Sequence, residues 1–246
     1  LDLAGKFPLS SLSLASSVTQ MTLANAAAIC NEETKQQKLG ELLLSSIRKT
    51  AILAAIPLAF IAGFSSLLVY GWLGNKPEYQ SLPQLIMMIS AGAYLHILTG
   101  PGSAIFRAEG KVSREYVYHA LRGLAYGIAA LSLLYVQVQH ILQLGWVTML
   151  ASAVAASFYH AYIFHYYPLP RMALFRVMLL PPLLFAALAA LNVWIYAHTG
   201  LIADTRLMAL LMLSVQGSLF LLQVAVLSYC LLANHERVAV RKWLAG

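Results

Sequence analysis

The stretch TAILAAIPLAFIAGFSSLLVYGWL, residues 50–73, decides the fold class, because it runs for more than twenty residues without a charged side chain. An apolar run of ~20 residues is long enough to cross the hydrocarbon core of a bilayer as an α-helix. Apolar and polar residues do not alternate here or elsewhere in the chain, which argues against a β-barrel. The stretch therefore predicts an all-α, polytopic integral membrane protein.

The composition of the whole chain extends this prediction beyond one segment. Sixty per cent of the 246 residues are hydrophobic and only 10% are charged, whereas a soluble domain has roughly 25% charged residues. We expect a single transmembrane helical domain over residues 1–246 with about seven spans, at residues 3–29, 50–73, 82–106, 116–136, 144–167, 177–197 and 207–233. Leu39, Leu42, Leu43 and Ile47 recur at helical spacing before the second span, which predicts an amphipathic segment along the membrane surface.

Positive charge alternates between the successive loops. The loops that follow the seven spans carry 4, 1, 3, 0, 2, 1 and 3 Lys or Arg residues. Because positive loops stay in the cytoplasm, the N-terminus of this chain is expected outside and the C-terminus in the cytoplasm. An odd number of spans with an outward start fits a fragment of a longer chain.

The distribution of charged residues excludes several kinds of function. The nine acidic residues all lie in loops, tails or span ends, so no pair of carboxylates is expected inside the membrane for acid–base catalysis or metal binding. We therefore expect no enzyme activity, no metal and no cofactor. The net charge of +7 is spread over short loops and forms no basic stripe with aromatics, which argues against nucleic-acid binding.

Arg122 is the charge deepest inside an expected span. It shares a helix face with Arg114 and Tyr118, and His119 lies on the neighbouring side. A guanidinium in hydrocarbon usually faces a bundle interior or a wet cavity, where it can bind phosphate oxygens in a bidentate manner. The alternative is that Arg122 snorkels to the cytoplasmic headgroups, which lie about two turns away.

Two further features point to a substrate path. The first span is unusually polar, and Ser13, Ser16, Ser17 and Gln20 recur at helical spacing. These side chains either line a hydrated path for a hydroxyl-rich solute or only permit close helix packing.

Gly100, Pro101 and Gly102 interrupt the third span, and they form either a hinge or the end of the helix. Pro181-Pro182 predicts a kink in the sixth span, and Gly123 with Gly127 has the spacing of a helix-packing motif.

The segment HILTGPGSAIFRAEGKVSREYVYHALRG, residues 96–123, resembles the second half of polysaccharide and O-antigen flippases. These belong to the multidrug/oligosaccharidyl-lipid/polysaccharide exporter superfamily. Its members often show a Gly-rich break and then a small residue, Gly and Lys, which Ala108, Gly110 and Lys111 match. The resemblance covers about residues 1–136, and Asn25-Ala26 stands where the family usually has a proline.

The resemblance implies a bundle of 12 to 14 helices in two related halves, of which this chain would form the second. It implies translocation of a polyprenyl-pyrophosphate-linked oligosaccharide across the inner membrane of a bacterium by alternating access. Expected partners are the lipid bilayer, the lipid-linked oligosaccharide, and glycan polymerase or ligase proteins. The alternative is a membrane-embedded enzyme or subunit of a glycan polymerase or assembly complex.

Overall fold

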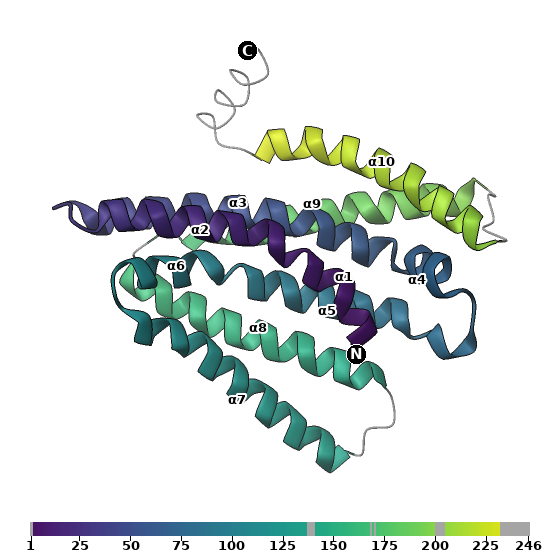
Figure 1. The fold of residues 1–246 in the computed structure, drawn as a ribbon, viewed down its shortest axis with the longest axis horizontal. Helices are drawn as coiled ribbons and strands as arrows, with labels where there is room; N and C mark the ends of the chain where they lie inside the picture. Colours follow the sequence, from purple (N-terminus) through teal and green to yellow (C-terminus); the bar gives the residue numbers. More distant parts are fainter. Residues whose placement is uncertain (1, 137–140, 168, 170, 200–204, 232–246) are drawn as a thin grey trace.

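The computed structural model describes residues 2–136, 141–167, 169, 171–199 and 205–231, and every regular element among them is helical. Figure 1 shows long helices packed side by side in one bundle. In chain order they are α1 (Asp2–Ser10), α2 (Leu12–Ile29), α3 (Lys35–Gly63), α4 (Ser65–Leu73), η1 (Pro77–Tyr79), α5 (Leu82–Ile97), α6 (Gly100–Ala108), α7 (Val112–Val136), α8 (Ile141–Tyr166), α9 (Arg171–His198) and α10 (Arg206–Leu231).

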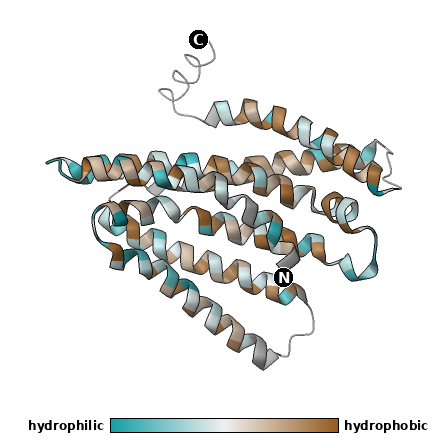
Figure 2. Ribbon diagram, viewed as in Figure 1, coloured by the Kyte–Doolittle hydropathy of each residue, from teal (hydrophilic) through white to brown (hydrophobic). Residues whose placement is uncertain are grey.

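The predicted all-helical architecture is confirmed, and within the described residues five helical segments have the length and apolarity to cross a membrane. They are Lys35–Gly63, Pro77–Ala108, Leu142–Tyr166, Met172–His198 and Arg206–Tyr229. Hydrophobic residues run along the long helices, and hydrophilic residues gather at the turns at both ends of the bundle (Figure 2). This is the distribution expected of a protein whose middle lies in lipid and whose ends lie in water.

The segment predicted to lie along the membrane surface is instead the first part of α3. Leu39, Leu43 and Ile47 are fully buried, and Gly40 lies against Leu169 at the connection between α8 and α9. Their spacing therefore marks a face that packs inside the bundle, because the same periodicity serves a buried stripe as well as a surface helix. The helix then ends at Gly63, and α4 continues after a bend at Phe64.

Close glycine contacts show which helices run in the same direction. Gly92 lies beside Met149, and Gly145 lies beside Leu85, so α5 and α8 are parallel. Gly100 contacts Thr19, and farther along the same pair Cys30 donates a hydrogen bond to the Ala108 carbonyl. Helices α2, α5–α6 and α8 thus share one direction.

Helix α7 runs in the opposite direction. Tyr118 of α7 meets Tyr159 of α8, and Tyr126 of α7 lies 3.5 Å from the Ser152 hydroxyl of α8, so these two helices are antiparallel. The turns that carry Lys35 and Lys111 therefore lie at the same end of the bundle, at the left of Figure 1. The turn between α4 and α5 lies at the other end.

Gly123 and Gly127 do not pack against another described helix. Apart from the neighbouring backbone of α7 itself, no atom of the described chain comes within 4 Å of where a Cβ on either residue would stand. The helix-packing role predicted from their spacing is therefore not used within the described part of the chain.

A proline in α9 leaves a backbone carbonyl without its helical hydrogen-bond donor, and a side chain of another helix supplies one. Pro182 has no N–H, so the carbonyl of Met178, four residues earlier, loses its helical partner. The Tyr94 hydroxyl of α5 donates a hydrogen bond to this carbonyl, with 2.5 Å between the two oxygens. Tyr94 is only 6% exposed, so water does not replace this bond at low cost.

This contact predicts that the cost of losing the Tyr94 hydroxyl depends on Pro182. Tyr94→Phe is expected to destabilise the protein by about 1–3 kcal/mol, since it leaves a buried carbonyl unpaired. In a Pro182→Ala background, residue 182 supplies the missing N–H, so the same change is expected to cost much less. Thermal unfolding of the four purified proteins in lipid nanodiscs measures the coupling.

The matched control is Pro57→Ala, which changes the proline inside α3 and leaves Met178 without a new donor. The cost of Tyr94→Phe is expected to stay full in that background. An equal cost in the Pro182→Ala and Pro57→Ala backgrounds would contradict the role assigned to Tyr94.

Candidate functional site

A cavity of about 370 Å³ lies where α2, the junction of α5 with α6, and the first turns of α7 meet. Its walls combine hydroxyl, amide, imidazole and charged side chains, although most of the bundle is apolar. We refer to it as the break cavity, and it is lined by Ala15, Ser16, Thr19, Gln20, His96, Ile97, Thr99, Gly100, Ser103, Arg107, Glu115, Tyr118 and His119.

The cavity is adjacent to an interruption in a membrane-spanning segment. Helix α5 ends at Ile97 and α6 begins at Gly100, so the break predicted around Gly100, Pro101 and Gly102 is present. Pro101 lacks the N–H that would bond to the Ile97 carbonyl, and the Thr99 hydroxyl donates to the His96 carbonyl at 2.7 Å. The interruption therefore places the polar groups of one helix turn beside the cavity.

The two glycines of the break have packing roles. A Cβ on Gly100 would stand 2.7 Å from the Thr19 hydroxyl of α2, and one on Gly102 would stand 2.2 Å from the Ile163 side chain of α8. Only glycine allows α6 to approach both neighbours this closely. The role of these residues as a moving hinge remains a prediction.

Helix α2 supplies the hydroxyl and amide wall. Ser16, Thr19 and Gln20 share one face, because residues three and four apart are neighbours on a helix. The Ser16 hydroxyl donates to the Ser13 carbonyl at 2.7 Å, and the Thr19 hydroxyl donates to the Ala15 carbonyl at 3.3 Å. Their oxygens keep lone pairs that can accept hydrogen bonds from a solute.

The opposite wall is built around an imidazole and a phenol. The His96 Nδ1 atom lies 2.8 Å from the Tyr118 hydroxyl, and the two rings stack with centroids 5.4 Å apart. The charge of Arg122, one turn after Tyr118, acts on both groups. The guanidinium of Arg122 lies over the Tyr126 ring, 5.5 Å from its centroid, and its buried Nε has no hydrogen-bond partner among the described residues.

An ion pair across the turn between α6 and α7 completes the cavity wall. Arg107 and Glu115 form a two-pronged pair, with Nε of Arg107 3.1 Å from Oε2 of Glu115. The Glu115 side chain is only 16% exposed, and the pair adds no net charge to the cavity wall.

The structure places the predicted site residues in three groups. Ser16, Gln20, Tyr118, His119 and Gly100 line the break cavity. Ser13 and Ser17 lie on the exposed side of α2, outside its walls.

The two arginines of α7 lie outside the walls as well. Arg114 packs over the Tyr166 ring at 3.9 Å, on the side of α7 that faces α8. Arg122 lies one turn beyond Tyr118, over Tyr126.

Sequence reasoning did not select the remaining polar wall residues, which are Thr19, His96, Thr99, Ser103, Arg107 and Glu115. Their proximity to the Gly-Pro-Gly break was the signal that could have found them.

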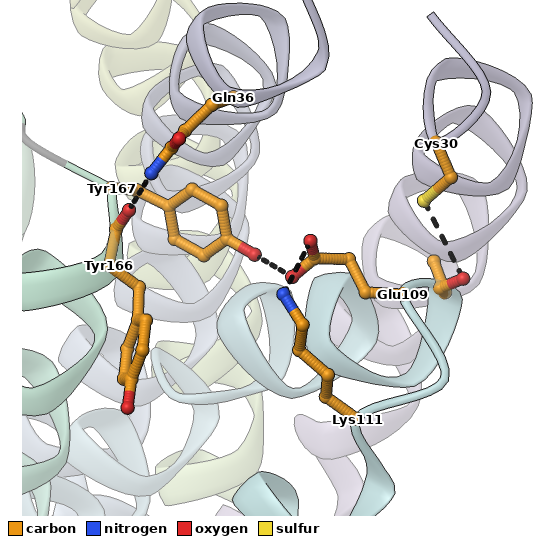
Figure 3. A network of polar contacts seen from close by, with 7 residues as sticks. Cys30, Gln36, Glu109, Lys111, Tyr166 and Tyr167 are labelled. Carbon is orange, nitrogen blue, oxygen red and sulfur yellow. Dashed lines mark hydrogen bonds and ion pairs between the residues drawn. The ribbon is translucent and has the colours of Figure 1, made fainter.

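A polar cluster ties together the connections at the end of the bundle that carries Lys35 and Lys111. In Figure 3 the Glu109 carboxylate accepts hydrogen bonds from Lys111 Nζ, at 2.8 Å, and from the Tyr167 hydroxyl. Gln36 Nε2 donates to the Tyr166 carbonyl at 2.9 Å. We call this group, together with Cys30, the end clasp.

The electrostatics of the end clasp favour the ionised form of Glu109. Burial alone raises the pKa of Glu109, but hydrogen bonds from Lys111 and Tyr167 and the charges of Lys111 and Lys35 outweigh it. The pKa of Glu109 therefore lies below its usual value. Burial and the neighbouring carboxylate raise the pKa of Tyr167.

Comparisons of the chain with protein-family models, with curated proteins and with solved structures found no match.

The lowered pKa of Glu109 predicts that the end clasp weakens in acid. Its contribution to stability is present above the unfolded carboxyl pKa of ~4.3 and is lost as pH falls through the lower folded pKa. Glu109→Gln is expected to lower the free energy of unfolding by about 2 kcal/mol near neutral pH. This difference from wild type should close below pH ~4, as thermal unfolding at several pH values would show.

The matched control is Glu32→Gln, which removes an exposed ion pair with Lys38. Exposed pairs contribute about 0–1 kcal/mol, so this variant is expected to stay close to wild type. A Glu109→Gln deficit that persists unchanged in acid would show that the ionised carboxylate is not its cause.

Proposed function

We propose that this chain is part of a transporter that moves a polyprenyl-pyrophosphate-linked oligosaccharide across the bacterial inner membrane by alternating access. The observation that carries the proposal is the break cavity, a polar cavity at an interrupted membrane helix. Interrupted helices at mid-membrane substrate sites are a recurring design of secondary transporters. In this mechanism no covalent bond is made or broken.

The chemistry of the cavity fits the two parts of such a substrate. Ser16, Thr19 and Gln20 offer uncharged hydrogen-bonding groups for sugar hydroxyls. Arg122 adds a cation one helix turn beyond Tyr118, and its buried Nε can donate a further hydrogen bond. A guanidinium suits pyrophosphate oxygens because it can donate two parallel hydrogen bonds.

We also propose that α1–α2 and α7 cross the membrane, which completes the count of seven spans. Helix α2 lies along α6 from Thr19 to Cys30, and α7 lies along α8 from Tyr118 to Tyr126. The turns that hold Lys35 and Lys111 share one end of the bundle, and the positive-inside rule assigns that end to the cytoplasm.

The exposed face of α2 supports a second half of the transporter. Ser13, Ser16, Ser17, Gln20 and Asn25 are exposed on this helix in the described chain. Polar groups in direct contact with lipid are costly, so a further helical unit facing α2 would enclose them. The break cavity would then lie between two halves of a bundle of 12 to 14 helices.

A second candidate is a membrane-embedded subunit of a glycan polymerase or assembly complex. The observation that favours it is the gathering of Glu115, His96 and His119 around one cavity, since such groups can move protons. Depletion in the native host separates the two functions. A transporter is expected to leave a complete lipid-linked glycan in the inner leaflet, whereas an assembly subunit leaves shortened glycans.

The transporter proposal predicts an order of activity at Arg122. Arg122→Lys is expected to retain partial transport, and Arg122→Gln and Arg122→Ala less, because a lysine offers charge without the bidentate geometry. Loss of one charge-assisted hydrogen bond should lower substrate affinity roughly ten- to a hundredfold. Transport is measured per molecule of inserted protein, which removes effects on membrane yield.

The matched control is Arg176→Gln, which changes an exposed arginine of α9 away from the break cavity. It is expected to transport at the wild-type rate. If Arg122 only snorkels to the headgroups, Arg122→Lys will retain full transport and Arg122→Ala will mainly lower yield. Full transport by every Arg122 variant would remove this residue from the proposed site.

A further inference from the structure

A second polar basin lies at the opposite end of the bundle from the end clasp, between α4 and the turn that leads to α5 (right side of Figure 1). It has a volume of about 500 Å³, within the range of about 300–1,000 Å³ that small-ligand sites occupy. The polar side chains that line it are Ser66, Tyr70, Asn75, Lys76, Tyr79 and Gln80.

The rim of this basin is held by specific contacts. Gly74 has a φ of 85°, a left-handed conformation that favours glycine. The Arg206 guanidinium of α10 packs over Gly74 and donates to the Leu73 carbonyl at 2.7 Å. The following turn closes with a hydrogen bond of 3.0 Å from the Tyr79 N–H to the Lys76 carbonyl. The basin is therefore formed before any ligand binds.

Lys76, which lines the basin, already has a carboxylate partner, which argues against an anionic ligand. The Lys76 Nζ atom lies 3.8 Å from the Glu78 carboxylate and 5.9 Å from the centre of the Tyr79 ring. The nearby Arg206 donates to the Leu73 carbonyl. A phosphate would meet the Glu78 carboxylate beside Lys76, so an uncharged ligand suits this surface better.

The remaining groups define the chemistry of that ligand. Asn75 and Gln80 are exposed amides that can both donate and accept hydrogen bonds. Tyr70 and Tyr79 also line the basin, and an aromatic ring with a polar tip suits a ligand that is apolar on its flat faces and polar at its edges. A sugar ring has this combination, with C–H groups on its faces and hydroxyls around its rim.

We propose that this basin is a carbohydrate-binding subsite for uncharged sugar units. The proposal deepens the proposed function, on which its biological role rests, because under the proposed orientation the basin faces the outside. It would receive the glycan part of the substrate after the pyrophosphate has left the neighbourhood of Arg122. We assign the two parts of the substrate to two sites because of their charges. The Arg122 guanidinium lies one helix turn beyond Tyr118 of the break cavity, whereas the lysine that lines the basin already faces Glu78.

The test is direct binding to the full chain in lipid nanodiscs, by saturation-transfer difference NMR. The probes are maltose, lactose and N,N′-diacetylchitobiose, with inorganic pyrophosphate as competitor. At least one disaccharide is expected to bind, and pyrophosphate is expected not to displace it. Asn75→Ala with Gln80→Ala should weaken binding at least about fivefold, because the double change removes both amides.

The control variant is Asn31→Ala, an exposed amide at the other end of the bundle, and it is expected to bind as wild type does. Tyr79→Ala removes an aromatic ring that lines the basin, and it is also expected to weaken sugar binding. Thermal unfolding of this variant shows whether it is folded. Failure of all three sugars to bind, equal binding by wild type and the Asn75/Gln80 variant, or displacement by pyrophosphate would each overturn the proposal. Wild-type transport by every Arg122 variant would instead count against the proposed function, and it would leave the sugar-binding result unchanged.

Discussion

The requirement to satisfy every buried backbone group without water shapes this structure more than any other constraint. The chain interrupts its helices with prolines and glycines, and side-chain hydroxyls donate to backbone carbonyls at two of these interruptions. The Tyr94 hydroxyl bonds to the Met178 carbonyl that Pro182 leaves unpaired. The Thr99 hydroxyl bonds to the His96 carbonyl just before Pro101. The positions of these donors therefore decide where the bundle can bend and still remain stable.

The same constraint accounts for the location of the break cavity. An interrupted helix brings backbone and side-chain polar groups into a region that is otherwise apolar, and these groups need partners. Helix α2 supplies hydroxyls and an amide on one side, and α7 supplies Tyr118 and His119 on the other. The close approach of Gly100 to Thr19 draws these walls together. The result is a polar cavity whose groups can form hydrogen bonds with a hydroxyl-rich solute.

The two ends of the bundle differ in their electrostatics, and the proposed function uses that difference. At one end the Glu109 carboxylate joins Lys111 and Tyr167, which links α6, α7 and α8 into one unit. At the other end Lys76 faces Glu78 and the Tyr79 ring, and Arg206 donates to the Leu73 carbonyl. A substrate that carries both a pyrophosphate and a neutral glycan would meet suitable chemistry for its charged part near Arg122 and for its sugars in the basin.

The sequence by itself determined the helical membrane class, the approximate positions of the helices, and the break at Gly100-Pro101-Gly102. These follow from local properties, namely apolar length, charge distribution and the missing N–H of proline. Periodicity alone predicted a surface location for residues 35–49, because an amphipathic face does not specify what covers it. Only the tertiary structure showed that α9 and its neighbours bury Leu39 and Leu43.

The tertiary structure also decided the membership of the site. It joined His96, Arg107 and Glu115 to the predicted Gln20, Tyr118 and His119, and it turned Arg114 toward Tyr166. Which side chains share a cavity depends on how helices far apart in the sequence pack, and residue spacing within one helix does not contain that information.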